Sequence, residues 1–160
     1  MDKGRFHTPN FLHLPRWYKP IGDITTSDIP PERVYFRSMV PLRSPHVALT
    51  VIDQSSGIAQ DVSISAIRHI PVLVAMTIFV SVDQRPQEED GPPILWDTHA
   101  AWQSHESIPY VQSTSRRDAI KSHIALVRLL SALVTDHAEI NDATIIAAMR
   151  DSLSLEDGAE

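Results

Sequence analysis

The sequence predicts an α+β domain: an antiparallel sheet of about four to five strands over residues 33–96, a helical hairpin over 116–154, and an extended N-terminal arm. Three observations predict this fold. Short β-branched segments separated by turn residues fill the first part of the chain. Apolar residues at helical spacing fill the last third, and five prolines interrupt the first 31 residues. We therefore expect an arm over 1–31, one domain over 32–155 and a frayed acidic tail over 156–160.

The arm combines its prolines with aromatic side chains. Proline at this density prevents a continuous helix and favours extended or turn conformations, whereas disordered tails are usually poor in aromatic residues. The arm is therefore expected to dock its apolar side chains, on its own domain or on a neighbouring copy. We hypothesise that the arm docks on a neighbouring subunit. The side chains expected to make this contact are Phe11, Leu14, Trp17 and Tyr18.

The sheet is predicted from β-rich segments that end at turn residues. The segment over 58–67 alternates apolar and polar residues, which is typical of an antiparallel strand with one buried face. The segment over 72–82 is apolar without alternation, so we expect it to be the central strand, covered on both faces. Residues 94–96 form a short apolar segment, and 97–114 are too mixed to assign. The expected strands are residues 32–40, 47–53, 58–67 and 72–82.

The helical hairpin is predicted from an apolar stripe and two capping residues. Ser115 is a good N-cap, and Asp118 three residues later resembles the acidic partner of a capping box. Asn141 is a good N-cap for a second helix that reaches Leu153. The short linker between the helices predicts an antiparallel pair. The stripe of the first helix consists of Ile120, Ile124, Val127, Leu130 and Val134.

The net charge of −6 is unevenly distributed. Residues 1–45 carry seven basic and four acidic residues, a charge of +3, so the remaining 115 residues carry −9. Such a molecule can associate head to tail or present one end to an anionic partner. Self-association is therefore expected, with a nucleic acid or an anionic protein surface as the other candidate partners.

Composition limits the compartment and the chemistry. The chain has no cysteine, which excludes disulfides, thiolate metal sites and a cysteine nucleophile. Its first residues lack the apolar region of a signal peptide, and its longest apolar stretch is too short for a transmembrane helix. We therefore expect an intracellular, cytoplasmic protein.

Two groups of basic residues suggest anion binding. Arg16-Trp17-Tyr18-Lys19 interleaves cations with aromatic rings, as single-stranded nucleic-acid sites do. The favoured alternative is that these residues fix the arm to the sheet, with Arg16 paired to an acidic loop. Arg116 and Arg117 oppose the dipole of their helix, so they are expected to bind an anion or carboxylates of another copy, such as those in residues 88–90. A nucleic-acid surface would require convergence of Arg5, Arg16, Lys19, Arg37 and Arg43.

The densest group of possible metal ligands contains His99 and His105, with Asp97 and Glu106 beside them. These side chains can bind a divalent ion, but the His-x5-His spacing matches no metal motif. Histidines packed in a polar loop are therefore favoured, and no metal or cofactor is expected. A small hydrolase or metalloenzyme around His99 and His105 is kept as an alternative.

No sequence motif names a reaction. The chain has no Gly-x-Ser-x-Gly elbow and no glycine-rich phosphate loop. A non-enzymatic structural or assembly protein is therefore the predicted function. An arm, a small sheet and covering helices are similar in general shape to small viral matrix or coat proteins. This is an analogy of architecture alone, because Tyr35 comes two positions too late after Pro30-Pro31 for a viral budding motif.

Overall fold

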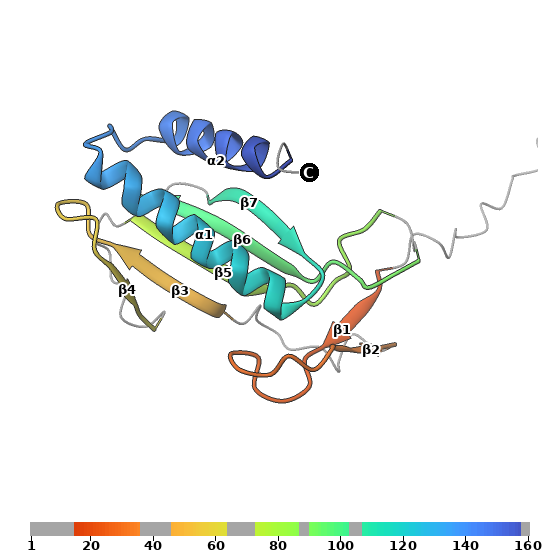
Figure 1. Cartoon of the computed structure of the whole chain (residues 1–160). Coiled ribbons are helices and arrows are strands. Elements are labelled where there is room, and N and C mark those ends of the chain that lie inside the picture. The colour runs from red at the N-terminus through yellow and green to blue at the C-terminus, as the bar shows by residue number, and fades with distance from the viewer. Residues whose placement is uncertain (1–14, 36–45, 64–72, 87–89, 103–106, 158–160) are drawn as a thin grey trace, which may run out of the picture.

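The structure is a computed structural model, and it describes residues 15–35, 46–63, 73–86, 90–102 and 107–157. Within these residues, seven strands precede two helices (Figure 1). The elements are β1 (Trp17–Lys19), β2 (Glu32–Val34), β3 (His46–Ile52), β4 (Ala59–Asp61), β5 (Leu73–Phe79), β6 (Trp96–Trp102), β7 (Ile108–Ser113), α1 (Arg116–Thr135) and α2 (Asp142–Asp157).

Five strands form one antiparallel sheet in the order β4-β3-β5-β6-β7, and β1 pairs with β2 in a separate two-stranded sheet. The α+β prediction is therefore confirmed, and so is the central position of β5. Its sequence contains no charged residue, and its single polar side chain, Thr77, is fully buried.

Helix α1 covers one face of the sheet. Its buried residues recur every three or four positions, so they form one stripe. Across the sheet, Thr50, Ala75 and Ala100 are direct neighbours on β3, β5 and β6. The two alanines leave room for the helix to approach the sheet, and Leu126 and Leu130 fill that room in a core shared with α2.

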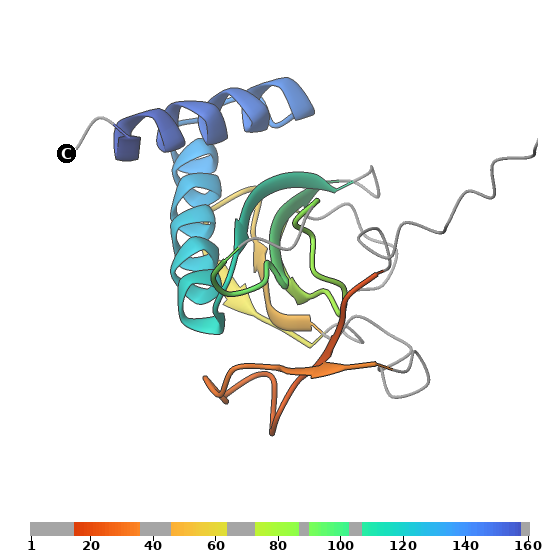
Figure 2. The same ribbon diagram turned by 90° about the vertical axis from the view of Figure 1, so that its right-hand side faces the viewer.

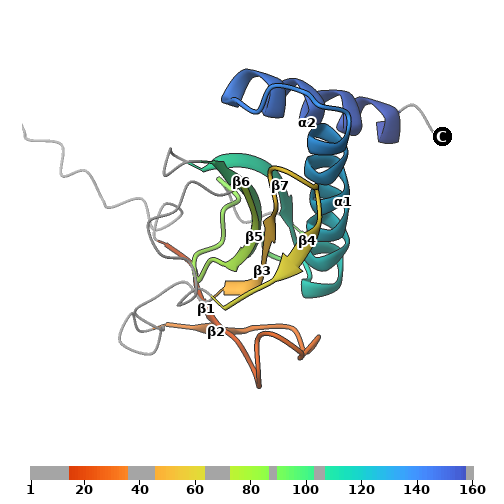
Figure 3. The same cartoon turned by 90° about the vertical axis from the view of Figure 1, so that its left-hand side faces the viewer.

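Helix α2 returns across the C-terminal end of α1 and reaches β7 (Figures 2 and 3). Ile145 and Met149 are its buried anchors in the core. The predicted caps are confirmed in position: the Ser115 hydroxyl accepts from the Asp118 N–H at 3.1 Å, and the Asn141 side chain accepts from the Thr144 N–H at 2.9 Å.

Residues 15–35, which we call the N-terminal hairpin, lie against one end of the domain (Figure 3). The backbone N–H of Tyr18 donates to the carbonyl of Ser81 at 2.8 Å, and that of Asp83 donates to the carbonyl of Arg16 at 3.0 Å. Tyr18 is buried in a second core cluster with Phe79, Leu95 and Trp96 among others. This part of the predicted arm is therefore bound to its own domain.

Several predicted boundaries were wrong. The strand expected over 32–40 contributes β2, which pairs with β1 and not with the main sheet. The main sheet extends through β6 and β7 to Ser113, well past residue 96. Of the strand expected over 58–67, the described residues 58–63 contribute β4, whose three residues are all exposed, and residues 64–67 lie outside the described part. Helix α2 continues to Asp157, into the predicted tail. Within the described part of the chain, no helix has the length and apolar character needed to cross a membrane.

Candidate functional site

A groove runs between α1 and the β3–β4 side of the sheet. Its volume is about 1220 Å³. Ile120, Ile124 and Val127 line it from the helix, while Leu49 and Val62 are among the residues that line it from the strand side. Ile124 is 45% exposed, whereas His123 beside it is buried. The remaining lining residues are Thr25, His46, Val47, Ala48, Thr50, Ala59, Asp61, Ser63, His123 and Arg128.

A continuous hydrogen-bonded chain lies at the floor of the groove, and we call it the His123 chain. His123 Nε2 lies 2.8 Å from the hydroxyl of Thr50, and Nδ1 lies 3.0 Å from the hydroxyl of Thr77. The Thr50 hydroxyl is also 2.8 Å from Asp61 Oδ1, and the Thr77 hydroxyl is 2.9 Å from that of Thr98. The His123 chain therefore connects four strands to α1.

The direction of these hydrogen bonds follows from the chemistry of the groups. A carboxylate can only accept, so Thr50 donates its hydrogen to Asp61 and must accept from His123 Nε2–H. In a neutral imidazole Nδ1 is then an acceptor, and Thr77 donates to it. Thr98 donates to Thr77 in turn. The fold thereby selects the Nε2-protonated tautomer of His123.

Burial favours the neutral form of both histidines at the groove. It lowers the pKa of His123, which is only 5% exposed, and the nearby charge of Asp61 raises that pKa without cancelling the effect. Burial also lowers the pKa of His46. The floor of the groove is therefore polar but uncharged at neutral pH, with Asp61 as an exposed carboxylate at its edge.

The predicted arm contacts divide into two groups. Tyr18 is buried in its own domain, which corrects the expectation that it docks on a neighbouring subunit, and Trp17 is half-buried beside it on β1. Phe11 and Leu14 lie outside the described residues, so their docking stays a prediction.

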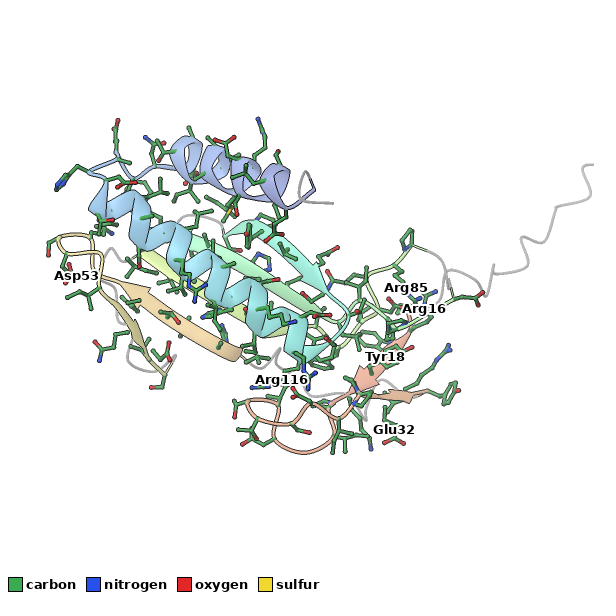
Figure 4. The ribbon with its side chains drawn as sticks, viewed as in Figure 1. Arg16, Tyr18, Glu32, Asp53, Arg85 and Arg116 are labelled. Atoms are coloured by element: carbon green, nitrogen blue, oxygen red, sulfur yellow. The ribbon has the colours of Figure 1, made fainter. Side chains whose placement is uncertain are left out.

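The predicted cations are largely engaged within the chain. Arg16 Nε lies 3.1 Å from Asp83 Oδ2, and Arg85 Nη2 lies 2.8 Å from the same oxygen (Figure 4). Burial by itself raises the pKa of Asp83, but hydrogen bonds from Arg85, from the Ile94 N–H and from Arg16 outweigh it and hold the pKa at about 2. Arg16 is 8% exposed and is therefore not available to a phosphate, as the arm-docking interpretation predicted.

Arg116 contacts the N-terminal hairpin of its own chain, and its binding to another copy stays a prediction. Its guanidinium lies 2.9 Å from Asp28 Oδ1 and also donates to the carbonyls of Ile24 and Thr25. Lys19 faces Glu32 at 3.7 Å on the same hairpin. Arg117 is exposed on the first turn of α1. Arg5, Arg37 and Arg43 lie outside the described residues, so convergence of a basic surface stays untested.

His99 lies on β6, on the face of the sheet away from α1. Its Nε2 is 3.7 Å from Asp97 Oδ2, and neither ring nitrogen makes a hydrogen bond to the described residues. His105 lies outside the described part. Among the described residues no three histidine or acidic side chains gather in a way that would hold a metal ion.

Sequence reasoning missed the His123 chain. Two signals could have indicated it: His123 interrupts the apolar stripe of α1, and Thr77 interrupts the apolar run of β5. Each is a polar residue at a position that the pattern assigns to the core, and buried polar groups require partners. That His123 and Thr77 are partners depends on how α1 crosses the sheet, which the sequence pattern does not show.

The fold and the groove together define an α+β domain with an open, mainly apolar groove above a buried polar floor. Comparison with protein-family models, with curated proteins and with solved structures gives no match to this chain. The evidence for its function is therefore the geometry of the groove and of the N-terminal hairpin.

Proposed function

We propose that this chain is a non-enzymatic assembly protein, and that residues 1–14 of one copy bind in the groove of a second copy. The observation that carries the proposal is the open apolar groove between α1 and the β3–β4 side of the sheet. Exposed apolar surface that is recessed and rimmed by polar groups is characteristic of a binding site. Its exposed centre on the helix is Ile124.

The size of the groove favours a peptide segment. Pockets for single small ligands occupy roughly 300–1,000 Å³, and this groove exceeds that range at about 1220 Å³. Several apolar side chains of one extended segment therefore fit along it. Its length beside two turns of α1, from Ile120 to Arg128, suits such a segment.

Residues 1–14 have the composition that the groove requires. Pro9 prevents a continuous helix, and four large apolar side chains are available for the groove: Phe6, Phe11, Leu12 and Leu14. The segment contains one acidic and two basic residues, and the groove offers one charged side chain of each sign, Asp61 and Arg128.

The place where this segment joins the domain is fixed, and its length allows it to reach a neighbour. The chain enters at Arg16, which is fixed in the buried ion pair with Asp83. Figure 4 shows Arg16 beside Arg85, at the end of the molecule opposite to Asp53 and beyond Arg116. Fourteen residues span at most about 50 Å. The segment is therefore long enough to reach the groove of another copy.

The buried position of the polar groups supports a non-enzymatic role. His123, Thr50 and Thr77 are each 5% exposed or less. Groups that act on a substrate must touch it, and these side chains instead bind one another. Action in the cytoplasm is part of the proposal, because a chain without cysteine requires no oxidising compartment.

Two full-length variants test the proposal by light scattering after size exclusion. The arm variant carries Phe11→Asp and Leu14→Asp, and the groove variant carries Ile124→Glu. Each should lower the native mass when alone. A one-to-one mixture should associate again, because the intact arm of the groove variant can bind the intact groove of the arm variant. Ile146→Glu on α2, where the isoleucine is 41% exposed, is the matched control and should keep the wild-type mass.

Three results would contradict this proposal. A monomeric wild-type chain would exclude assembly. An unchanged mass in the groove variant would exclude the groove as the receiving site. Failure of the mixture to associate would exclude binding of an intact arm in the intact groove of another copy. Nucleic acid that copurifies and is lost with Arg5→Ala would favour the nucleic-acid alternative.

A further inference from the structure

The His123 chain holds the second turn of α1 against the sheet at the floor of the groove. One imidazole links β3 through Thr50 and β5 through Thr77, with Asp61 of β4 and Thr98 of β6 at the two ends. The same helix turn presents Ile120 and Ile124 to the groove. The position of His123 therefore determines where this wall of the groove lies.

The surroundings of His123 offer little compensation for a positive charge. From β4 the charged group is Asp61, which is exposed and separated from the imidazole by the Thr50 hydroxyl. From β3 the titratable group is His46, and from α1 itself Arg128 lines the same groove. The residues that face it from β5 and β6 are the uncharged Thr77 and Thr98. A positive charge on the His123 imidazole, in addition to that of Arg128, would therefore be poorly stabilised.

We propose that the His123 chain is an acid-sensitive latch of the groove: protonation of His123 displaces the imidazole from between Thr50 and Thr77, moves α1 away from β3 and releases the bound arm. This inference rests on the proposed function, in which the arm of a second copy occupies the groove. The neutral, Nε2-protonated imidazole satisfies every hydrogen bond of the chain, whereas the imidazolium must also donate from Nδ1. Thr77 would then have to turn its own hydrogen towards Thr98.

The direction of the pH effect follows from proton linkage. Burial lowers the pKa of His123, so the folded protein binds fewer protons than the unfolded chain, in which histidine titrates near about 6.5. Stability is therefore complete above that pH and falls below it, by at most about tenfold in the unfolding equilibrium constant per pH unit. The loss ends when the pH passes the folded pKa. His46 contributes in the same direction, because burial lowers its pKa as well.

The experiment compares the full-length wild type with His123→Gln and His46→Gln between about pH 7.5 and about pH 5.5. Native mass is measured by light scattering, and stability by urea unfolding. Glutamine retains an amide donor at the Nε2 position but does not titrate. The wild type and His46→Gln should lose both mass and stability on acidification, whereas His123→Gln should keep its mass and lose most of the pH dependence of unfolding.

The possible results separate the latch from the assembly proposal. A wild type that is monomeric at every pH overturns the assembly proposal and with it the release of the arm, while the unfolding series still tests whether protonation of His123 loosens α1. If the native mass and the unfolding of His123→Gln depend on pH as strongly as those of the wild type, the latch is overturned. If His123→Gln does not fold, ¹⁵N NMR of wild-type His123 decides: the Nε2-protonated tautomer with a pKa below 6.5 is required, and titration at or above 6.5 in the folded protein overturns the inference.

Discussion

Replacement of Asp83 by asparagine should destabilise the protein strongly, because Asp83 fixes the N-terminal hairpin to the domain. Its side chain is fully buried and accepts hydrogen bonds from Arg16, from Arg85 and from the Ile94 N–H. A pKa held at about 2 instead of 3.8 corresponds to roughly 2.5 kcal/mol of stability at neutral pH. Asparagine also leaves the buried Arg16 cation without its counter-charge, and breaking such a pair costs about 3–5 kcal/mol. We therefore expect a loss of about 3 kcal/mol.

The assay is urea unfolding at neutral pH and in a series down to about pH 2. The folded pKa of Asp83 is depressed, so its contribution is complete above about pH 4 and is lost as the pH falls towards 2. The difference between wild type and Asp83→Asn should therefore shrink over that range. Glu32→Gln is the matched control: it removes the exposed contact with Lys19 and should cost below about 1 kcal/mol. A cost for Asp83→Asn no larger than that of the control would refute the reasoning.

Three other predictions concern the core and the turns. Thr50→Val preserves the shape but leaves His123 Nε2–H without its acceptor, so urea unfolding should show a loss of about 1–3 kcal/mol; an unchanged midpoint would mean that the His123 chain does not stabilise the fold. Gly57→Ala places a methyl group 2.8 Å from Thr135 Cγ2 at a φ of 75°, so it should cost more than Gly91→Ala, where φ is 109° but the space is open. His137 has a φ of 57° at the end of α1, so His137→Gly should raise the melting temperature by about 2–4 °C; a lower value would contradict the strain argument.

The elements that the sequence predicted well are those whose local pattern and burial agree. β5 is an apolar strand apart from Thr77 and lies at the centre of the sheet, and α1 carries an apolar stripe between recognisable caps. β6 was not assigned because Asp97 and His99 occupy its second face, while Thr98 and Ala100 face the core. β7 was obscured by Pro109, which an edge strand tolerates and a central strand does not.

The parts of the site that escaped prediction depend on contacts between distant residues. Arg16 and Asp83 are 67 positions apart, and Thr50 and His123 are 73 apart. Periodicity can show that His123 lies on the buried face of α1, but it cannot show which strand supplies its acceptor. The same limit applies to Tyr18: its aromatic, proline-rich surroundings predict docking, whereas the choice between its own domain and a neighbour requires the position of Ser81.

The geometry of the proposed contact restricts the assemblies that it can form. An arm that enters a neighbour's groove uses two different surfaces, so successive copies form a closed ring, an open filament or, when two copies exchange arms, a twofold dimer. The base of the arm is fixed by the Arg16–Asp83 pair, and the start of α1 is tied to the N-terminal hairpin by the Arg116–Asp28 pair. The departure point of the arm and one end of the groove are therefore held by the same hairpin. A fixed relation between donor and acceptor sites favours one angle between successive copies, and a single angle yields a defined assembly instead of a mixture of aggregates.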